Sequence, residues 1–146
     1  MDFDTRKNLA SNWFKSLQDS FCEDIKKLEN KRVQFKSTSW KKNITKDEGG
    51  GEYRILQNGK IFEKVGVNFS KVYGKFPKQF QNNIPGAKKD PRFWASGISV
   101  VMHMQNPLIP AMHFNTRYIC TTKDWFGGGM DVCLLYTSDA ADEDLR

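Results

Sequence analysis

Residues 96–120 decide the fold. They consist of a first arm, Ser96-Gly-Ile-Ser-Val-Val-Met-His-Met104, the connection Gln-Asn-Pro-Leu-Ile-Pro, and a second arm, Ala111-Met-His-Phe-Asn-Thr-Arg-Tyr-Ile-Cys120. Polar and apolar side chains alternate in both arms, which is typical of strands with one buried and one open face. Two prolines mark the connection between the arms. We therefore predict an antiparallel hairpin of two strands, 96–104 and 111–120.

The alternation also sorts the side chains of this hairpin onto two faces. If the strands pair about Leu108, His103 lies opposite His113 and Ser99 lies opposite Arg117. One face then carries five polar residues: Ser99, His103, His113, Asn115 and Arg117. Because the two histidines could share a ligand or a proton there, we interpret this face as a ligand site. The alternative is that both histidines are half-buried strand residues and Arg117 is a surface charge.

The apolar spacing upstream of this hairpin is helical. Six residues recur at intervals of three or four, and Phe14 widens the stripe that they form: Leu9, Trp13, Leu17, Phe21, Ile25 and Leu28. This pattern predicts one amphipathic helix from about residue 5 to 29. Asp4 is its expected N-cap and Asn30 its expected stop.

A second hairpin is predicted at Asn58-Gly59, between the strand patterns 53–56 and 61–65. Both centres of a type I′ turn need positive φ, which this dipeptide tolerates. A helix followed by a run of antiparallel strands is an α+β pattern. The fold class that we expect is therefore α+β, with an N-terminal amphipathic helix and a largely antiparallel sheet.

Composition limits the possible functions. The chain has 146 residues, 23 Lys and Arg against 17 Asp and Glu, and a net charge of +6. Such an excess favours an anionic partner, which is a nucleic acid, a membrane surface or a polycarboxylate substrate. The three cysteines are too far apart for a zinc ribbon or an iron–sulfur cluster. No apolar run approaches the roughly 20 residues of a membrane span, so we expect a cytoplasmic protein.

Two glycine-rich segments have more than one interpretation. The segment 125–129, Trp-Phe-Gly-Gly-Gly, combines flat apolar surface with backbone that a ligand can approach closely, and Asp131 follows it. The alternative interpretation is a turn. The segment 49–51 is three glycines near Arg54, but it lacks the GxxxxGK[ST] pattern of a phosphate-binding loop.

Five blocks of this sequence resemble the oxygen-dependent coproporphyrinogen III oxidases in order and spacing. They are VGVNFS at 65–70, GISVVMH at 97–103, Asn106-Pro107, HFNTRY at 113–118 and WFGGGMD at 125–131. The resemblance covers most of residues 9–131 and corresponds to the N-terminal half of a family member. It implies that this sheet is part of a larger sheet flanked by helices. Residues 132–146 depart from the family pattern, and we expect them to be a non-family tail from a frameshift or adapter sequence.

The resemblance implies an enzyme of haem biosynthesis. Such an enzyme converts two propionates of coproporphyrinogen III to vinyls, with O2 as co-substrate and no organic cofactor, and gives protoporphyrinogen IX. Matching residues imply that Ser99 and the run Asn115, Thr116 and Arg117 contact the substrate. His113 would be the proton donor.

Two further roles come from the same matching. Arg117 and Asp131 resemble the charged pair at the tetrapyrrole, with Asp131 facing pyrrole N–H groups and Arg117 facing a carboxylate. His103 and His113 would be ligands of a divalent metal, where a metal is used. Two more histidines of the family's metal set, and the segment through which the family forms homodimers, would lie beyond this half. We therefore expect the 146-residue chain alone to be inactive.

Three rival hypotheses remain open at this point. A nucleic-acid-binding β module without enzymatic activity predicts cations and exposed aromatic residues clustered on one sheet face. An oxygen-independent radical enzyme would need a cluster-binding cysteine motif, which the sequence lacks. A purely structural domain is favoured if His103 and His113 lie on opposite faces.

Overall fold

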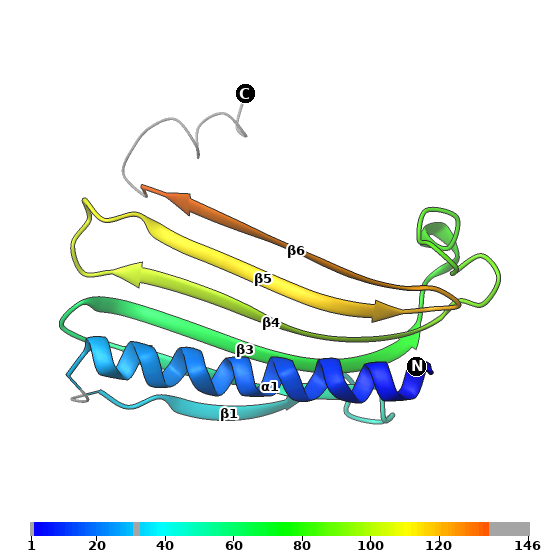
Figure 1. Ribbon diagram of the computed structural model, residues 1–146, viewed down its shortest axis with the longest axis horizontal. Helices are drawn as coiled ribbons and strands as arrows, with labels where there is room; N and C mark the ends of the chain where they lie inside the picture. The colour runs from blue at the N-terminus through cyan, green and yellow to red at the C-terminus, as the bar shows by residue number, and fades with distance from the viewer. Residues whose placement is uncertain (1, 31–32, 135–146) are drawn as a thin grey trace.

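The computed structural model describes residues 2–30 and 33–134. Its main elements are α1 (Phe3–Leu28), β1 (Lys36–Lys41), β2 (Gly49–Gln57), β3 (Phe62–Lys75), β4 (Arg92–Met104), β5 (Ala111–Cys120) and β6 (Asp124–Cys133). The strands form one antiparallel sheet in chain order (Figure 1). The α+β prediction is confirmed.

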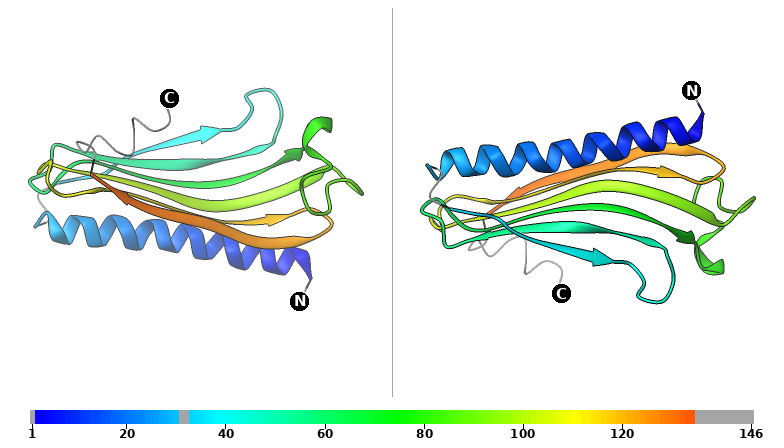
Figure 2. Two further views of the ribbon diagram at one scale, coloured as in Figure 1. Left: turned by 90° about the horizontal axis from the view of Figure 1, so that it is seen from above. Right: turned by 90° about the horizontal axis from the view of Figure 1, so that it is seen from below.

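The sheet has one covered face and one open face. Figure 2 shows α1 lying along one face, and no α-helix of the described ranges lies on the other. We call the face away from α1 the open face. No helix among the described residues is long and apolar enough to cross a membrane.

The N-cap of the helix lies two residues before its predicted position. The side chain of Asp2, not Asp4, is the N-cap, and its Oδ1 accepts a hydrogen bond from the main-chain N–H of Thr5 at 2.8 Å. Asp4 lies within the first turn, where its charge favours the positive end of the helix dipole. The predicted stop is confirmed, because α1 ends at Leu28 and Asn30 adopts a left-handed φ of 54°.

The predicted apolar stripe of α1 is only partly the buried one. Leu9, Trp13 and Leu28 are 56%, 61% and 57% exposed. Steps of four residues rotate the side-chain direction by about 40° each, so positions 9 and 25 point about 160° apart. They therefore cannot share one face. The buried line is Ala10, Ser11, Phe14, Gln18, Cys22 and Ile25.

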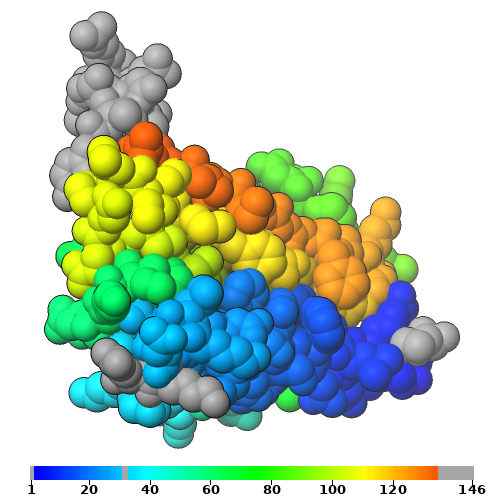
Figure 3. All heavy atoms as spheres, turned by 60° about the vertical axis from the view of Figure 1, so that its left-hand side comes forward, coloured from blue at the N-terminus to red at the C-terminus, as the bar shows by residue number. Residues whose placement is uncertain are grey.

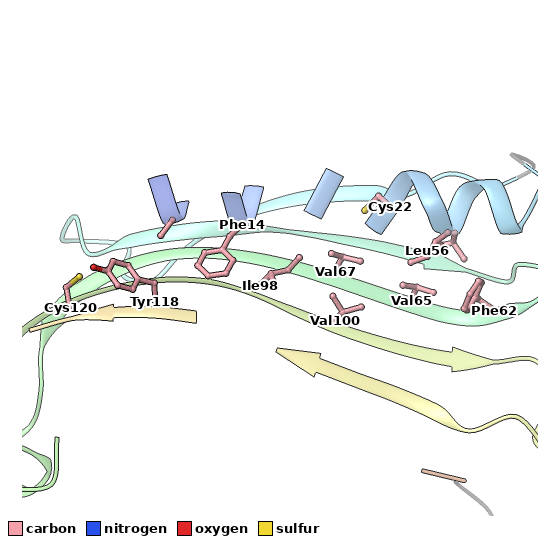
Figure 4. Packing of buried hydrophobic residues seen from close by; sticks show 12 residues of the cluster. Phe14, Cys22, Leu56, Phe62, Val65, Val67, Ile98, Val100, Tyr118 and Cys120 are labelled. Carbon is pink, nitrogen blue, oxygen red and sulfur yellow. The ribbon is translucent and has the colours of Figure 1, made fainter. Parts of the chain in front are cut away.

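The core lies between this line and the covered face of the sheet (Figure 4). Alternating residues of four strands supply its other side: Leu56, Phe62, Val65, Val67, Ile98, Val100, Tyr118 and Cys120. Gln18 is fully buried among them. Its amide nitrogen donates to the carbonyls of Glu52 at 2.9 Å and Val67 at 3.0 Å, and its oxygen accepts from Lys15 at 2.9 Å. This polar side chain is thus fully satisfied and ties the helix to β2 and β3.

Glu29 attaches the C-terminal end of α1 to the β2–β3 turn. Its carboxylate, 3% exposed, accepts main-chain hydrogen bonds from Lys60 at 2.7 Å and from Ile61 and Phe62 at 2.8 Å each. Burial alone would raise the pKa of Glu29, but these three bonds outweigh burial and hold it below the ordinary value.

The hairpin predicted around Asn58-Gly59 is confirmed, but the predicted type I′ turn is wrong. Positive φ occurs at Asn58 and not at Gly59. The ladder closes at Gln57 and Lys64, with Asn58 N–H bonded to the Glu63 carbonyl at 2.9 Å. A longer loop forms because three successive N–H groups converge on the Glu29 carboxylate.

The opposite end of α1 is attached to the β5–β6 turn. The Tyr118 hydroxyl donates a short hydrogen bond to Asp124, and Arg6 Nη1 lies 2.7 Å from the same carboxylate. Burial, followed by the bond to Asp124, raises the pKa of Tyr118 well above its usual value. Tyr118 is therefore a neutral structural donor.

The central hairpin has the predicted strands with a different register. β5 has the predicted bounds, and Ser99 pairs with Asn115 while Val101 pairs with His113. The predicted pairings of His103 with His113 and of Ser99 with Arg117 are wrong by two residues. The turn is closed by a bond from Ile109 N–H to the Asn106 carbonyl, so its centre precedes Leu108. Because the slip is an even number, every side chain keeps its predicted face.

β6 is the last strand of the described sheet. Its ten residues pair with β5 from Asp124 to Cys133, so the turn interpretation of 125–129 is wrong. Seen from the helix side, its atoms remain visible beyond α1 (Figure 3). Its helix-side residues Phe126, Met130 and Val132 are 65%, 68% and 52% exposed.

Candidate functional site

The open face brings together residues from β3 to β6. Directly paired residues point to the same face, so the ladder defines transverse rows of side chains. One row contains Ser99 and Asn115, and Gly129 follows it on β6. Neither Ser99 nor Asn115 has a side-chain hydrogen-bond partner in the part of the chain that the structure describes. Both side chains are thus available to a ligand.

His103 and His113 lie on this same face. Their ring centroids are 6.5 Å apart and their planes are inclined by 46°. His113 pairs with Val101 rather than with His103, so the two imidazoles are diagonal neighbours. The structural-domain rival, which needs them on opposite faces, loses its support.

Asp131 is the strand partner of His113. The pairing of β5 with β6 places the two residues opposite each other, and Asp131 Oδ2 lies 3.3 Å from His113 Nδ1. A carboxylate at this nitrogen favours the tautomer with its proton on Nδ1, which leaves Nε2 free for proton transfer. The two side chains are 51% and 65% exposed, so a ligand can reach both.

Arg117 lies two rows from Asp131 on the open face. It pairs with Gly97 on β4 and Gly127 on β6, and it forms no ion pair with any residue of 2–30 or 33–134. Four residues along the strands plus one strand spacing separate Arg117 from Asp131 by roughly 14 Å. The unpaired cation and the carboxylate therefore lie on either side of Asn115.

Thr116 is the one predicted site residue that the structure places elsewhere. It pairs with Ile98 on the face covered by α1, and its hydroxyl lies 3.4 Å from the Gly127 carbonyl. Its side chain is therefore not brought together with those of Ser99, Asn115 and Arg117. The period of two along β5 requires this separation from its two neighbours.

Three glycines line the open face without a steric reason for being glycine. A Cβ at Gly66, Gly127 or Gly129 would meet no atom within 4 Å. Gly66 pairs with Val101, and the other two pair with Arg117 and Asn115. Free space above bare backbone suits a flat ligand that approaches the sheet closely.

The described residues do not form a metal site by themselves. No group of three or more His, Cys, Asp or Glu side chains within 2–30 and 33–134 could hold a metal ion. His103, His113 and Asp131 are the donors nearest to such a group, but Asp131 Oδ2 already lies 3.3 Å from His113 Nδ1. Since zinc sites use at least three protein ligands, a zinc ion here would need ligands from outside these residues.

The segment after Asp131 continues the sheet for two residues. Val132 pairs with Met112 and Cys133 pairs with Ala111, so these two residues of the predicted tail belong to β6. The remainder, from residue 135 onward, lies outside the described residues. The predicted boundary at Asp131 stays a prediction.

Comparison with known proteins gives a consistent assignment. The family model described as coproporphyrinogen III oxidase matches residues 9–145. The oxygen-dependent coproporphyrinogen-III oxidases of Rickettsia felis, Rickettsia typhi and Rickettsia prowazekii are each 48% identical over 141 residues, covering 91% of this chain and 49% of the relative. The chain thus spans about half the length of these curated relatives. A family-model match over most of the chain shows that the chain belongs to the coproporphyrinogen III oxidase family.

Proposed function

We propose that the open face is the substrate-binding half of a site for oxidative decarboxylation of coproporphyrinogen III. Each propionate would lose CO2 and two hydrogens to become a vinyl, and O2 would take up two electrons and two protons to become H2O2. The observation that carries this proposal is the meeting of His113, Asp131 and an unpaired Arg117 on one face that no described helix covers.

Each side chain has a role that its surroundings support. Arg117 would bind a substrate carboxylate, because its guanidinium offers fixed, bidentate donors. Asp131 would face the pyrrole N–H groups and stabilise positive charge that develops on the ring. His113, held through Nδ1 by Asp131, would move a proton at Nε2. Ser99 and Asn115 would orient the substrate between these groups.

Several finer expectations remain proposals beside this one. Thr116 can contact a substrate only from the covered face or through its main chain. A metal held by His103 and His113 is proposed only with additional ligands. The cytoplasmic location, the homodimer and the inactivity of the 146-residue chain alone also stay predictions.

The test is O2-dependent vinyl formation by a protein of full family length that carries these residues. Arg117→Ala and Asp131→Ala should each lower kcat/KM about a hundredfold, because each removes a preorganised charge-assisted contact. His113→Ala should be comparably severe. Two controls remove charges from the exposed side of α1, Lys27→Ala and Asp24→Ala, and should leave kcat/KM within about twofold.

The assay also separates this proposal from its rivals. Activity that persists without O2, or that ignores both Arg117 and Asp131, would refute it. His103→Ala should matter only if a metal is used.

The nucleic-acid-binding alternative receives less support from the geometry. Among the paired strand residues of the described sheet, alternation puts the cations Lys36, Lys64 and Arg117 on the open face, on three different strands. These cations are widely spaced rather than continuous, whereas phosphate tracking needs a basic stripe.

A further inference from the structure

The polar row across the open face continues beyond the residues with assigned roles. Asn68 on β3 pairs with Ser99 on β4, which in turn pairs with Asn115 on β5. All three side chains therefore share the open face. Neighbouring strands lie about 4.8 Å apart, so the row from Asn68 to Asn115 spans roughly 10 Å.

Trp40 fixes the orientation of the Asn68 amide. The Trp40 indole N–H donates to Asn68 Oδ1 at 3.0 Å. An indole nitrogen is only a donor, so the amide must turn its oxygen toward Trp40. Trp40 is on β1, on the side of Asn68 away from β4, so the amide nitrogen is the atom that does not face Trp40. This nitrogen has no partner among residues 2–30 and 33–134.

Gly51 allows Trp40 to reach Asn68 across the intervening strand. β2 lies between β1 and β3, and Gly51 pairs with Trp40 on one side and Ser70 on the other. A Cβ at Gly51 would lie 2.8 Å from Cζ2 of the Trp40 ring. Any larger residue would therefore displace the indole from above β2.

We propose that Asn68 is a further substrate-contacting residue, whose amide N–H groups donate to a substrate carboxylate, with Trp40 as its positioning residue. This inference rests on the proposed function and deepens it. Arg117 would bind one carboxylate on the β5 side, and Asn68 would bind another about 12 Å away on the β3 side. A macrocycle with carboxylates around its rim presents acceptors to both.

The experiment measures binding to the 146-residue chain, which contains the whole row. The ligands are coproporphyrinogen III and its tetramethyl ester, both kept under argon so that neither is oxidised. Asn68→Asp retains an oxygen for the Trp40 N–H but replaces the donor with an anion. It should weaken binding of the acid about tenfold or more. Trp40→Phe should weaken it about threefold, because the ring remains but the amide loses its orientation.

Two comparisons distinguish substrate contact from a structural role. The ester cannot offer a carboxylate, so its affinity should change less than twofold in each variant, whereas a general loss of structure would weaken both ligands equally. Asn8→Asp adds the same charge on the exposed side of α1 and is the matched control. Thermal melting without ligand monitors the fold, and Asn68→Ala provides a second, uncharged variant.

The outcomes separate the two proposals. Asn68→Asp and Asn68→Ala with wild-type affinity, beside an Arg117→Ala variant that loses binding, would overturn the role of Asn68 and leave the proposed function standing. Equal weakening for acid and ester would also overturn it. A wild-type chain that binds neither ligand would overturn the Asn68 proposal, while O2-dependent activity at full family length would still support the proposed function.

Discussion

Replacing Glu29 by glutamine should destabilise the fold in a pH-dependent manner. The carboxylate accepts three main-chain bonds of 2.7–2.8 Å at the β2–β3 turn and is 3% exposed. A glutamine oxygen can still accept from Ile61 and Phe62, but the bonds lose their charge assistance. Its NH2 group would face the Lys60 N–H, so two donors would oppose each other.

The expected cost follows from these bonds. Two bonds would lose their charge assistance and one bond would be lost outright. Together these losses should lower the free energy of unfolding by about 2–3 kcal/mol at pH 7. For a domain of this size the melting temperature should fall by roughly 6–10 °C. Glu63→Gln, at an exposed carboxylate on β3, is the control and should change stability by less than about 0.5 kcal/mol.

The pH dependence gives the sharper measurement. The folded-state pKa of Glu29 lies below its ordinary value, so its contribution is complete above the unfolded pKa of about 4.3 and is lost as pH falls through the folded pKa. Urea unfolding at a series of pH values should show wild type and Glu29→Gln converging below about pH 4. A difference that stays constant from pH 7 to pH 3 would refute the charge-based account of this contact.

Three further substitutions test packing and the open face. Gln18→Leu should lower the free energy of unfolding by about 2 kcal/mol, because the carbonyls of Glu52 and Val67 lose their donor. An unchanged midpoint of urea unfolding would contradict this. Gly97→Ala should lower the melting temperature, since its Cβ would lie 2.5 Å from the Thr116 carbonyl oxygen. Gly127→Ala should leave melting unchanged, because nothing lies within 4 Å, yet should weaken substrate binding severalfold if a ligand occupies that space. Wild-type binding by Gly127→Ala would count against a ligand there.

The alternation of polar and apolar residues was sufficient to predict the faces of the central hairpin. Its register was not predictable, because the sequence does not say where a loop with two prolines closes. In the structure Gln105 bonds to the β2–β3 turn, with its N–H 2.8 Å from the Ile61 carbonyl and its amide 3.0 Å from that of Gly59. These contacts keep the end of β4 against β3, where His103 pairs with Lys64, while the ladder between β4 and β5 ends at Met102 and Met112.

The contacts that the sequence did not predict are tertiary. The turn chemistry of Asn58-Gly59 favours a tight hairpin, but the Glu29 carboxylate, about 30 residues earlier, draws three N–H groups into a longer loop. The predicted apolar stripe of α1 is wrong for a local reason: residues spaced by four rotate progressively around the helix axis, so they leave the buried face. The buried line from Ala10 to Ile25 spans about 120° of the helix and includes the polar residues Ser11 and Gln18, which an apolar pattern does not select.

In the candidate site too, alternation predicts the face on which each side chain lies but not the side chain that it contacts. The role of Asp131 is predicted only by the family resemblance, because a turn is the alternative interpretation of 125–129. Once β6 is a strand, its period of two puts Asp131 on the face of His113, and the pairing with β5 brings Nδ1 and Oδ2 to 3.3 Å. Asn68 and Trp40 show the same effect over a longer distance, since β1 and β3 are not neighbours and meet only over Gly51. Alternation therefore predicts which residues can serve a common ligand, whereas the ladder determines which of them orient one another, and that orientation gives His113 and Asn68 their proposed roles.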